Sequence, residues 1–189
     1  MSFWSLAASD IGAWAELWLR QRDQRRAPSL ATCFRLLWTY VGLRATVLYR
    51  LSHALHRRGV SGVPQSLWRM NIMLHGLDIP PSVEIGPHLY IPHPVGTVVM
   101  ASRIGRRATL VSGVTIGMRN ELAFPVIGDD VFVGAGARVL GGITVGDDVS
   151  IGANAVVLAD VPSHSVAVGV PARVKRKAAP ADPTGQVSP

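Results

Sequence analysis

Aliphatic residues recur every six positions through the middle of the chain. The recurrence runs through Ile79, Ile85 and Ile91, then Val98, Ile104, Leu110 and Ile116, then Ile127, Val133, Val139, Val145, Ile151 and Val157. A glycine often follows the aliphatic residue directly. A helix repeats its hydrophobic residues with a period of 3.6 and a strand with a period of two, so neither explains this pattern alone. A period of six is typical of a chain wound into a triangular coil with one short strand on each side.

The pattern therefore predicts a mostly β protein built on a parallel β-helix. Each coil of such a solenoid buries its aliphatic residues against the coils on either side. At three marked positions per coil the segment forms about four coils, and at roughly 4.8 Å per coil the stack is about 20 Å tall. An ordinary β-sandwich is the alternative, but its turns come at irregular intervals of roughly 8–12 residues. The spacing does not set the handedness of the coil.

The residues before the repeat have helical periodicity instead. We expect three helices, over residues 2–20, 29–58 and 64–77, with a polar linker over 21–28. Ser29 can cap the second helix, Gly59 ends it, and Pro64 suits the start of the third. All five tryptophans lie in this region. We interpret them as packing residues between helices rather than as a ligand site or a membrane belt.

These patterns divide the chain into three parts. Residues 1–77 form an α-helical N-terminal cap, and residues 78–172 form the hexapeptide β-helix. Residues 173–189 are a tail that is first basic and then rich in alanine and proline, which we expect to be disordered from Ala178 onward.

The period of six is broken in two places. The step from Ile91 to Val98 is one residue too long, and the extra residue falls beside His93. The step from Ile116 to Ile127 is five residues too long, which predicts a loop thrown out from a corner of the coil. A regular solenoid needs neither break, and such insertions usually carry binding or catalysis.

The repeat also predicts which side chains share a column along one edge of the coil. Positions two residues after the marked aliphatic are equivalent from one coil to the next. One such column contains His93, Ser112, Ala135 and Ala153. Above His93 the column has only small side chains, so we expect a shallow groove that is open to a long, thin ligand.

The net charge of +7 is distributed unevenly along the chain, which matters for binding to anionic partners. Residues 1–77 carry +7, residues 78–170 carry −3 and residues 171–189 carry +3. A basic cap could contact anionic lipid, but we favour solvated arginines on helix faces over peripheral membrane contact. No nucleic-acid-binding motif accompanies the charge, so we expect no nucleic-acid partner.

The remaining composition points to the cytoplasm. The single Cys33 excludes a disulfide within the chain, which fits a reducing compartment. Residues 1–20 contain two acids and lack a basic start, so they do not read as a signal peptide. The apolar run over 30–51 is interrupted by three arginines, which makes it a poor membrane span.

Four segments resemble the serine acetyltransferases and, more broadly, the left-handed β-helix acyltransferases. They are residues 78–86 (DIPPSVEIG), 91–96 (IPHPVG), 133–142 (VGAGARVLGG) and 169–173 (GVPAR). The resemblance covers about residues 70–176 of the sequence. The IPHPVG segment is also similar to the colanic-acid-type polysaccharide acetyltransferases. The resemblance implies a left-handed coil, acetyl-CoA as donor, and a homotrimer with active sites between subunits.

The resemblance also implies roles for single residues. His93 matches the catalytic histidine of the family and Asp78 matches its carboxylate partner, fifteen residues earlier. For the coenzyme we expect Ser112, Ala135 and Ala153 along the groove, with Arg173 and Lys175 near its phosphates. For the acceptor we expect Pro92, Arg119, Asn120 and Phe124.

The sequence departs from the serine acetyltransferases around the acceptor. That family has an aspartate directly before the catalytic histidine and an Arg-His pair in the extended loop. The positions here are Pro92, Ala123 and Phe124, which lack the charges that bind a zwitterion. The last residue is Pro189, not the isoleucine with which the family binds cysteine synthase, so we do not expect that complex. The acceptor hydroxyl therefore stays open between serine and a sugar.

The expected function is an acetyl-CoA-dependent O-acetyltransferase. A hydroxyl is a poor nucleophile at neutral pH and needs a base, for which we expect His93. Backbone N–H groups near Gly96 or in the 117–120 turn could stabilise the oxyanion. A metalloenzyme of the carbonic-anhydrase type needs three histidine ligands, but the coil histidines lack ligand-like spacing, so no metal is expected. A non-catalytic trimeric scaffold would leave the break at His93 without a purpose.

Overall fold

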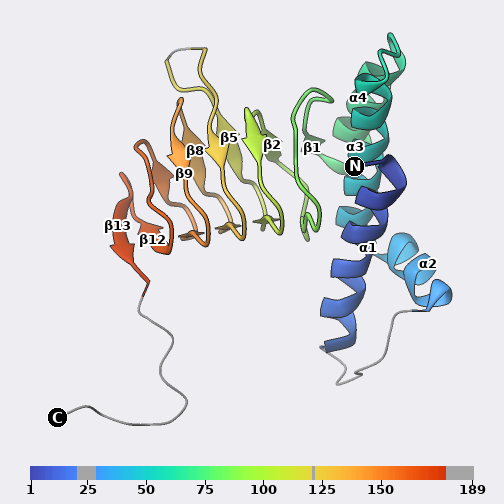
Figure 1. The fold of residues 1–189 in the computed structure, drawn as a ribbon, viewed down its shortest axis with the longest axis horizontal. Coiled ribbons are helices and arrows are strands. Elements are labelled where there is room, and N and C mark those ends of the chain that lie inside the picture. Colours follow the sequence, from blue (N-terminus) through green and yellow to red (C-terminus); the bar gives the residue numbers. More distant parts are fainter. Residues whose placement is uncertain (21–28, 121, 178–189) are drawn as a thin grey trace.

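A computed structural model describes residues 1–20, 29–120 and 122–177. The expected linker over 21–28 and the expected disorder from Ala178 lie outside these residues. The helices are α1 (Phe3–Arg20), α2 (Leu30–Thr39), α3 (Val41–Arg57) and α4 (Val63–His75). They form a cap at one end of a β coil, which extends away from them toward β13 (Figure 1).

The strands form three sheets that make the sides of the coil. Sheet A contains β1 (Leu77–Asp78), β2 (Thr97–Val99), β5 (Thr115–Gly117), β8 (Arg138–Leu140) and β11 (Val156–Val157). Sheet B contains β3 (Arg103–Ile104), β6 (Val126–Ile127) and β9 (Thr144–Val145). Sheet C contains β4 (Thr109–Leu110), β7 (Phe132–Val133), β10 (Ser150–Ile151), β12 (Ser165–Val168) and β13 (Arg173–Arg176).

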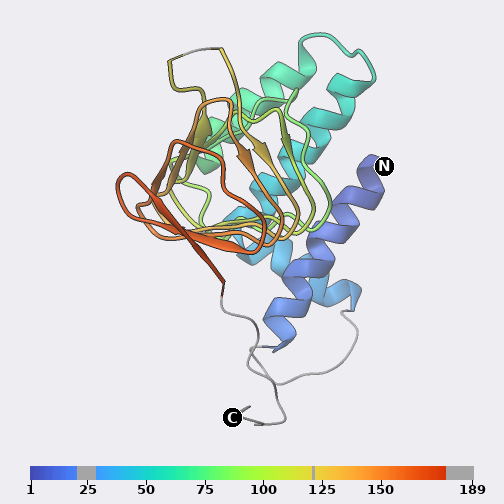
Figure 2. The same cartoon turned by 60° about the vertical axis from the view of Figure 1, so that its left-hand side comes forward.

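The chain passes from sheet A to sheet B to sheet C in every turn of the coil. The pairings between successive coils are parallel, and among the strands of the described residues only β13 pairs antiparallel, with β12. Figure 2 shows the successive coils nested one behind another. The molecule therefore has three corners, which we name A–B, B–C and C–A after the sheets that they join. The division of the chain at residues 77 and 172 stays a prediction.

The marked aliphatic residues fill the centre of the coil, with one exception. All of them but Val98 are buried. Val98 is half-buried, and its neighbour Val99 is the fully buried residue that pairs with Ile116. The prediction for Val98 is wrong because residues 93–97 occupy the place that residues 112–114 occupy in the next coil. The turn after His93 is thus two residues longer than its neighbour, not one.

The predicted helix over 29–58 is divided at Tyr40. This residue has extended backbone angles (φ −102°, ψ 113°) between α2 and α3. The two helices run in different directions, so the predicted hydrophobic stripe does not form one face. Phe34 and Trp38 on α2 are 72% and 79% exposed. The packing interpretation holds for buried Trp14 but is wrong for Trp38 and for Trp4, which is 78% exposed.

The cap is joined to the first coil by buried polar groups. Arg50 of α3 pairs with Asp10 of α1 at 2.8 Å, and both side chains are fully buried. The Arg50 guanidinium also donates to the carbonyl oxygens of Ile85 and Gly86, at 2.5 and 2.6 Å. The Asp10 carboxylate accepts from the Leu89 N–H at 2.8 Å. One ion pair therefore joins two helices and the first coil.

No helix in the described ranges is both long enough and apolar enough to cross a bilayer.

Candidate active site

His93 lies at the C–A corner, in the long turn between Tyr90 and β2. Its backbone forms a parallel bridge with Ser112 of the next coil. The Thr97 N–H donates to the Pro94 carbonyl oxygen at 3.0 Å, which closes the turn. Prolines on both sides of His93 restrict its backbone. The imidazole is exposed and makes no hydrogen bond to any other described residue. A rigid turn thus presents a free histidine side chain.

Asp78 ends β1 and lies opposite Val98 in sheet A. Its Oδ1 accepts a hydrogen bond from Nε1 of Trp68 on α4 at 2.9 Å. No hydrogen bond joins Asp78 to His93 in the described chain, so the pairing of their side chains stays a prediction. Sequence reasoning did not single out Trp68 as a partner. The signal available was an indole ten residues before the aspartate, on the last helix before the coil.

The first turn of α3 lies directly against the segment that carries His93. A Cβ added to Gly42 would be 1.9 Å from the carbonyl oxygen of Ile91 and 3.0 Å from that of Pro92. No real side chain fits at such distances, so this close approach requires glycine. The cap therefore supports the backbone two residues before His93. The sequence around Gly42 did not predict this contact, because the residue lies within an expected helix.

The column above His93 forms as the repeat predicts. Leu110, Val133 and Ile151 are aligned in register in sheet C, which places Ser112, Ala135 and Ala153 above one another two residues later. Hydrogen bonds of 2.8 Å join the successive turns: Gly136 N–H to Ser112 O, and Asn154 N–H to Ala135 O. Ser112 and Ala135 are half-buried and Ala153 is exposed. Their role in coenzyme binding stays a prediction.

Arg138 lies beside this column and was not among the expected residues. Its Nη1 donates to the carbonyl oxygens of Gly113 and Gly136, at 2.6 and 2.9 Å. The guanidinium thereby joins two successive turns at the C–A corner. The signal in the sequence was an arginine directly before the inward Val139, at a position where the repeat faces outward.

The basic residues of β13 are not all at the same corner. Strand β13 runs antiparallel to β12, with Arg173 opposite Val168 and Lys175 opposite Val166. Val168 lies toward the C–A corner, so Arg173 is near the upper end of the column. Lys175 lies further along sheet C. Lys177 hydrogen-bonds Asp148 at 2.5 Å, near the B–C corner. Of these bases, Arg173 is the one that lies near the column, and its role as a phosphate ligand stays a prediction.

The inserted loop leaves the coil at the A–B corner, between β5 and β6, and projects beyond it (Figure 1). Arg119 and Asn120 are exposed, and the Phe124 carbonyl oxygen accepts from Ser102 Oγ at 3.1 Å. His93 lies at the opposite edge of sheet A. Within one chain the structure does not bring these three loop residues to His93. Of the expected acceptor residues, only Pro92 is adjacent to it.

Across the described ranges, no group of three or more His, Cys, Asp or Glu residues is arranged to hold a metal ion. Acyl transfer requires none, because a positioned base and hydrogen-bond donors are sufficient.

Comparisons with known proteins agree with this architecture. A family described as bacterial transferase hexapeptide (six repeats) matches residues 124–159. The serine acetyltransferase of Helicobacter pylori is 40% identical over 161 residues, which cover 83% of this chain and 94% of that protein. Soybean serine acetyltransferase complexed with serine has a TM-score of 0.78 at 32% identity and covers 92% of this chain and 70% of that one.

A serine acetyltransferase in complex with CoA has a TM-score of 0.77 at 32% identity, covering 92% of this chain and 69% of that one. These similarities confirm the expected left-handed parallel β-helix with a helical N-terminal cap. Because the similarity includes nearly the whole Helicobacter pylori protein, the chain belongs to the serine acetyltransferase family of acyltransferases.

Proposed function

We propose that this protein transfers the acetyl group of acetyl-CoA to the hydroxyl of serine. The observation that carries the proposal is His93, an exposed histidine on a proline-flanked turn at the foot of a column of small residues. The relatives are serine acetyltransferases, and the similar structures include complexes with CoA and with serine. The histidine supplies a base, and the column supplies space for the donor.

In the proposed reaction His93 removes the proton from the serine hydroxyl. The hydroxyl oxygen attacks the thioester carbonyl carbon and forms a tetrahedral oxyanion. The intermediate collapses, the carbon–sulfur bond breaks, and the imidazolium returns its proton to the leaving thiolate. The products are O-acetylserine and coenzyme A. Asp78 would orient the ring of His93 and stabilise its charged form, and Trp68 would hold Asp78 in place.

The backbone hydrogen bonds show which N–H groups near His93 already have an acceptor. The Gly96 N–H donates to the Gly76 carbonyl oxygen at 3.0 Å, so this one group is occupied, and a donor near Gly96 or in the 117–120 turn stays a prediction. The backbone of residues 117–120 remains the proposed donor. These residues lie at the A–B corner, on the other edge of sheet A.

We infer a homotrimer from this separation of the two corners. His93 is at the C–A corner, while Arg119, Asn120 and Phe124 are at the A–B corner. A cyclic trimer would place the A–B corner of one subunit beside the C–A corner of the next and repeat this contact three times around a closed ring. Leu122, which is 83% exposed, would then contact a neighbouring subunit. The reducing cytoplasm is the proposed location, since the single cysteine forms no disulfide within the chain.

The direct test is release of free thiol from acetyl-CoA with a panel of acceptors. We expect turnover with L-serine and much less with the amide and ester forms of serine, which lack the carboxylate that Arg119 of a neighbouring subunit would bind. Rapid thiol release without any acceptor would show simple hydrolysis and contradict the proposal.

A sugar hydroxyl is the second candidate acceptor. It is favoured by the uncharged side chains of Pro92, Ala123 and Phe124, where the family has charged or polar groups. The same assay separates the two, because a hexose or aminosugar acceptor would then exceed serine in kcat/KM. That result would change the acceptor and leave the donor site and His93 unchanged.

A further inference from the structure

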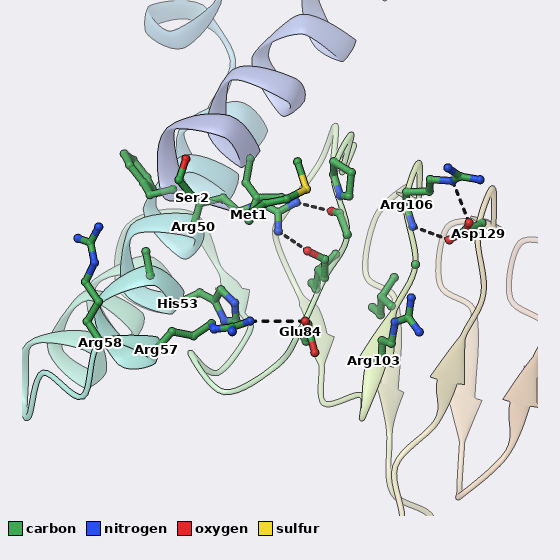
Figure 3. A pocket seen from close by; sticks show the side chains of 18 residues that line it. Met1, Ser2, Arg50, His53, Arg57, Arg58, Glu84, Arg103, Arg106 and Asp129 are labelled. Carbon is green, nitrogen blue, oxygen red and sulfur yellow. Dashed lines mark hydrogen bonds and ion pairs between the residues drawn. The ribbon is translucent and has the colours of Figure 1, made fainter.

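A cavity lies between the cap and the coil, well away from His93. Its volume is about 500 Å³, within the range of small-molecule sites. The first turn of α1 and the end of α3 form one side, and residues 84–87 and 103–106 form the other (Figure 3). The coil residues belong to sheet B and the B–C corner, whereas His93 and its column are at the C–A corner.

The lining of this cavity is strongly basic. It includes the arginines Arg50, Arg57, Arg58, Arg103 and Arg106 and the carboxylates Glu84 and Asp129. Five positive charges less two negative ones leave a net charge of +3 on these side chains. Asp10, which pairs with Arg50 behind the lining, lowers the sum to +2. Low-dielectric walls concentrate such a field and attract anions.

The arginines differ in how fully they are paired. Arg106 is bound to Asp129 at 2.9 Å. Arg57 and Glu84 are 3.6 Å apart with both side chains more than half exposed, a geometry that holds them only weakly. Arg103 has no partner among the described residues, and Figure 3 shows it on the other side of Glu84 from Arg57. Two guanidinium groups are thus available to one ligand.

The floor of the cavity adds a buried acceptor. Nδ1 of His53 is 2.9 Å from the Pro81 carbonyl oxygen, so Nδ1 carries the proton and Nε2 is the acceptor. Nε2 has no partner among the described residues. Burial lowers the pKa of His53, which keeps the ring neutral near pH 7. The neutral Nε2 can accept a hydrogen bond from a ligand hydroxyl.

The wall formed by α1 is apolar. Phe3 and Leu6 of α1, with Met1 before the helix, line the cavity together with Ile85 and Pro87 of the coil. A ligand that fits these surfaces has an anionic end and an organic body. Guanidinium groups bind phosphate oxygens in a bidentate manner, which lysine cannot do.

We propose that this cavity binds a small phosphate ester, with the phosphate between Arg57 and Arg103 and the organic body against the first turn of α1. A hydroxyl of the body would donate to Nε2 of His53. The ligand would bridge α3 and sheet B, the same elements that Arg50 joins. The proposal does not depend on the acceptor or on His93, so its failure and the failure of the proposed function are distinguishable.

Calorimetric titration of the full chain with adenosine monophosphate is the test, and the paired variants below separate this cavity from the donor site. Inorganic phosphate probes the anionic end alone, and citrate probes an anion of another geometry. We expect the nucleotide to bind more tightly than phosphate, and phosphate more tightly than citrate. Absence of nucleotide and phosphate binding at millimolar concentration would overturn the proposal.

Paired variants assign the binding to this cavity. Arg57→Ala combined with Arg103→Ala should weaken nucleotide binding roughly tenfold to hundredfold, the effect of losing charge-assisted hydrogen bonds. Arg20→Ala combined with Arg69→Ala removes the same charge from exposed positions outside the cavity and should change the affinity less than twofold. Equal weakening in both double variants would show a general charge effect and contradict the site.

A variant that should raise the nucleotide affinity, rather than lower it, provides the sharpest check. Glu84→Gln removes the carboxylate that lies between the two arginines and competes with an incoming phosphate. Nucleotide affinity should rise several-fold in this variant, because the repulsion is lost and Arg57 is released. An unchanged or weaker affinity would contradict the placement of the phosphate beside Glu84.

Discussion

The coil and the cap are stabilised in different ways. In the coil each inward residue repeats a contact that the coils above and below also make, and the central column of Ile, Leu and Val is buried throughout. In the cap a few contacts that occur once hold the helices, chiefly the Asp10–Arg50 ion pair and the packing of Gly42 on Ile91. A substitution at one coil position therefore removes one of many similar contacts. A substitution in the cap removes a contact that no other residue repeats.

This difference determines which parts of the candidate active site should respond to substitutions in the cap. The column of small residues is part of the regular coil, so its shape follows from the repeat. The turn that carries His93 is irregular, and its backbone lies against the cap. We therefore expect the donor groove to tolerate change in the cap, and the position of His93 to depend on it.

The largest loss of stability should follow from breaking the buried ion pair. Arg50→Met leaves the Asp10 carboxylate buried without its partner and should lower the free energy of unfolding by roughly 3–5 kcal/mol. Urea unfolding followed by circular dichroism measures the change. The double variant with Asp10→Asn should recover part of the loss, since no unpaired charge then remains. A loss below about 1 kcal/mol for Arg50→Met would show that the pair does not join the cap to the coil.

A side chain at Gly42 should damage the site more than the coil. Gly42→Val places atoms where the Ile91 and Pro92 carbonyl oxygens lie, so the turn must move. We expect a loss of about 1–3 kcal/mol, as for overpacking of a core, together with a fall in kcat at unchanged KM for acetyl-CoA. Gly12→Val is the control, because nothing lies within 4 Å of a Cβ there. Equal kinetics in the two variants would contradict the contact.

Filling the column should affect binding and spare the fold. Ala153 is exposed, so Ala153→Leu should change the free energy of unfolding by less than about 0.5 kcal/mol, as at other surface positions. The larger side chain should raise KM for acetyl-CoA and leave KM for the acceptor nearly unchanged. Ala159→Leu, at an exposed position outside the column, is the matched control. Unfolding by Ala153→Leu with normal coenzyme binding would show that the column is not the donor groove.

The smallest effect concerns stability at mildly acidic pH. Burial lowers the pKa of His53 and of His75 from the ordinary value of 6.5. The folded chain therefore takes up these protons less readily than the unfolded chain. Their contribution is constant above pH 6.5 and is lost as the pH falls below that value.

The free energy of unfolding, measured with urea between pH 7.5 and 5.5, should fall on the acidic side. His53→Gln should make that fall shallower, whereas His56→Gln, at an exposed position of α3, should leave it unchanged. An identical slope in both variants would contradict the assignment to His53.

The sequence was sufficient to predict the architecture of the coil but not the contacts of the cap. The reason is physical. Thirteen marked positions with a spacing of six, broken only twice, constrain every face, and the column of Ser112, Ala135 and Ala153 follows from the same count. Val98 and Val99 are adjacent and chemically alike, so the pattern could not show which one is buried. The Asp10–Arg50 pair spans forty residues, and nothing local marks it. The break at Tyr40 lies within an uninterrupted hydrophobic stripe, so periodicity alone could not place it.

The central claim is that His93 acts as the general base at the foot of the column. The most direct measurement is thiol release by His93→Ala and by the wild-type protein, at saturating acetyl-CoA and L-serine. We predict a turnover roughly 10²–10⁴-fold lower in the variant, with unchanged affinity for coenzyme A in calorimetry and unchanged melting temperature. Turnover within a few-fold of wild type would contradict it and move the base to another residue.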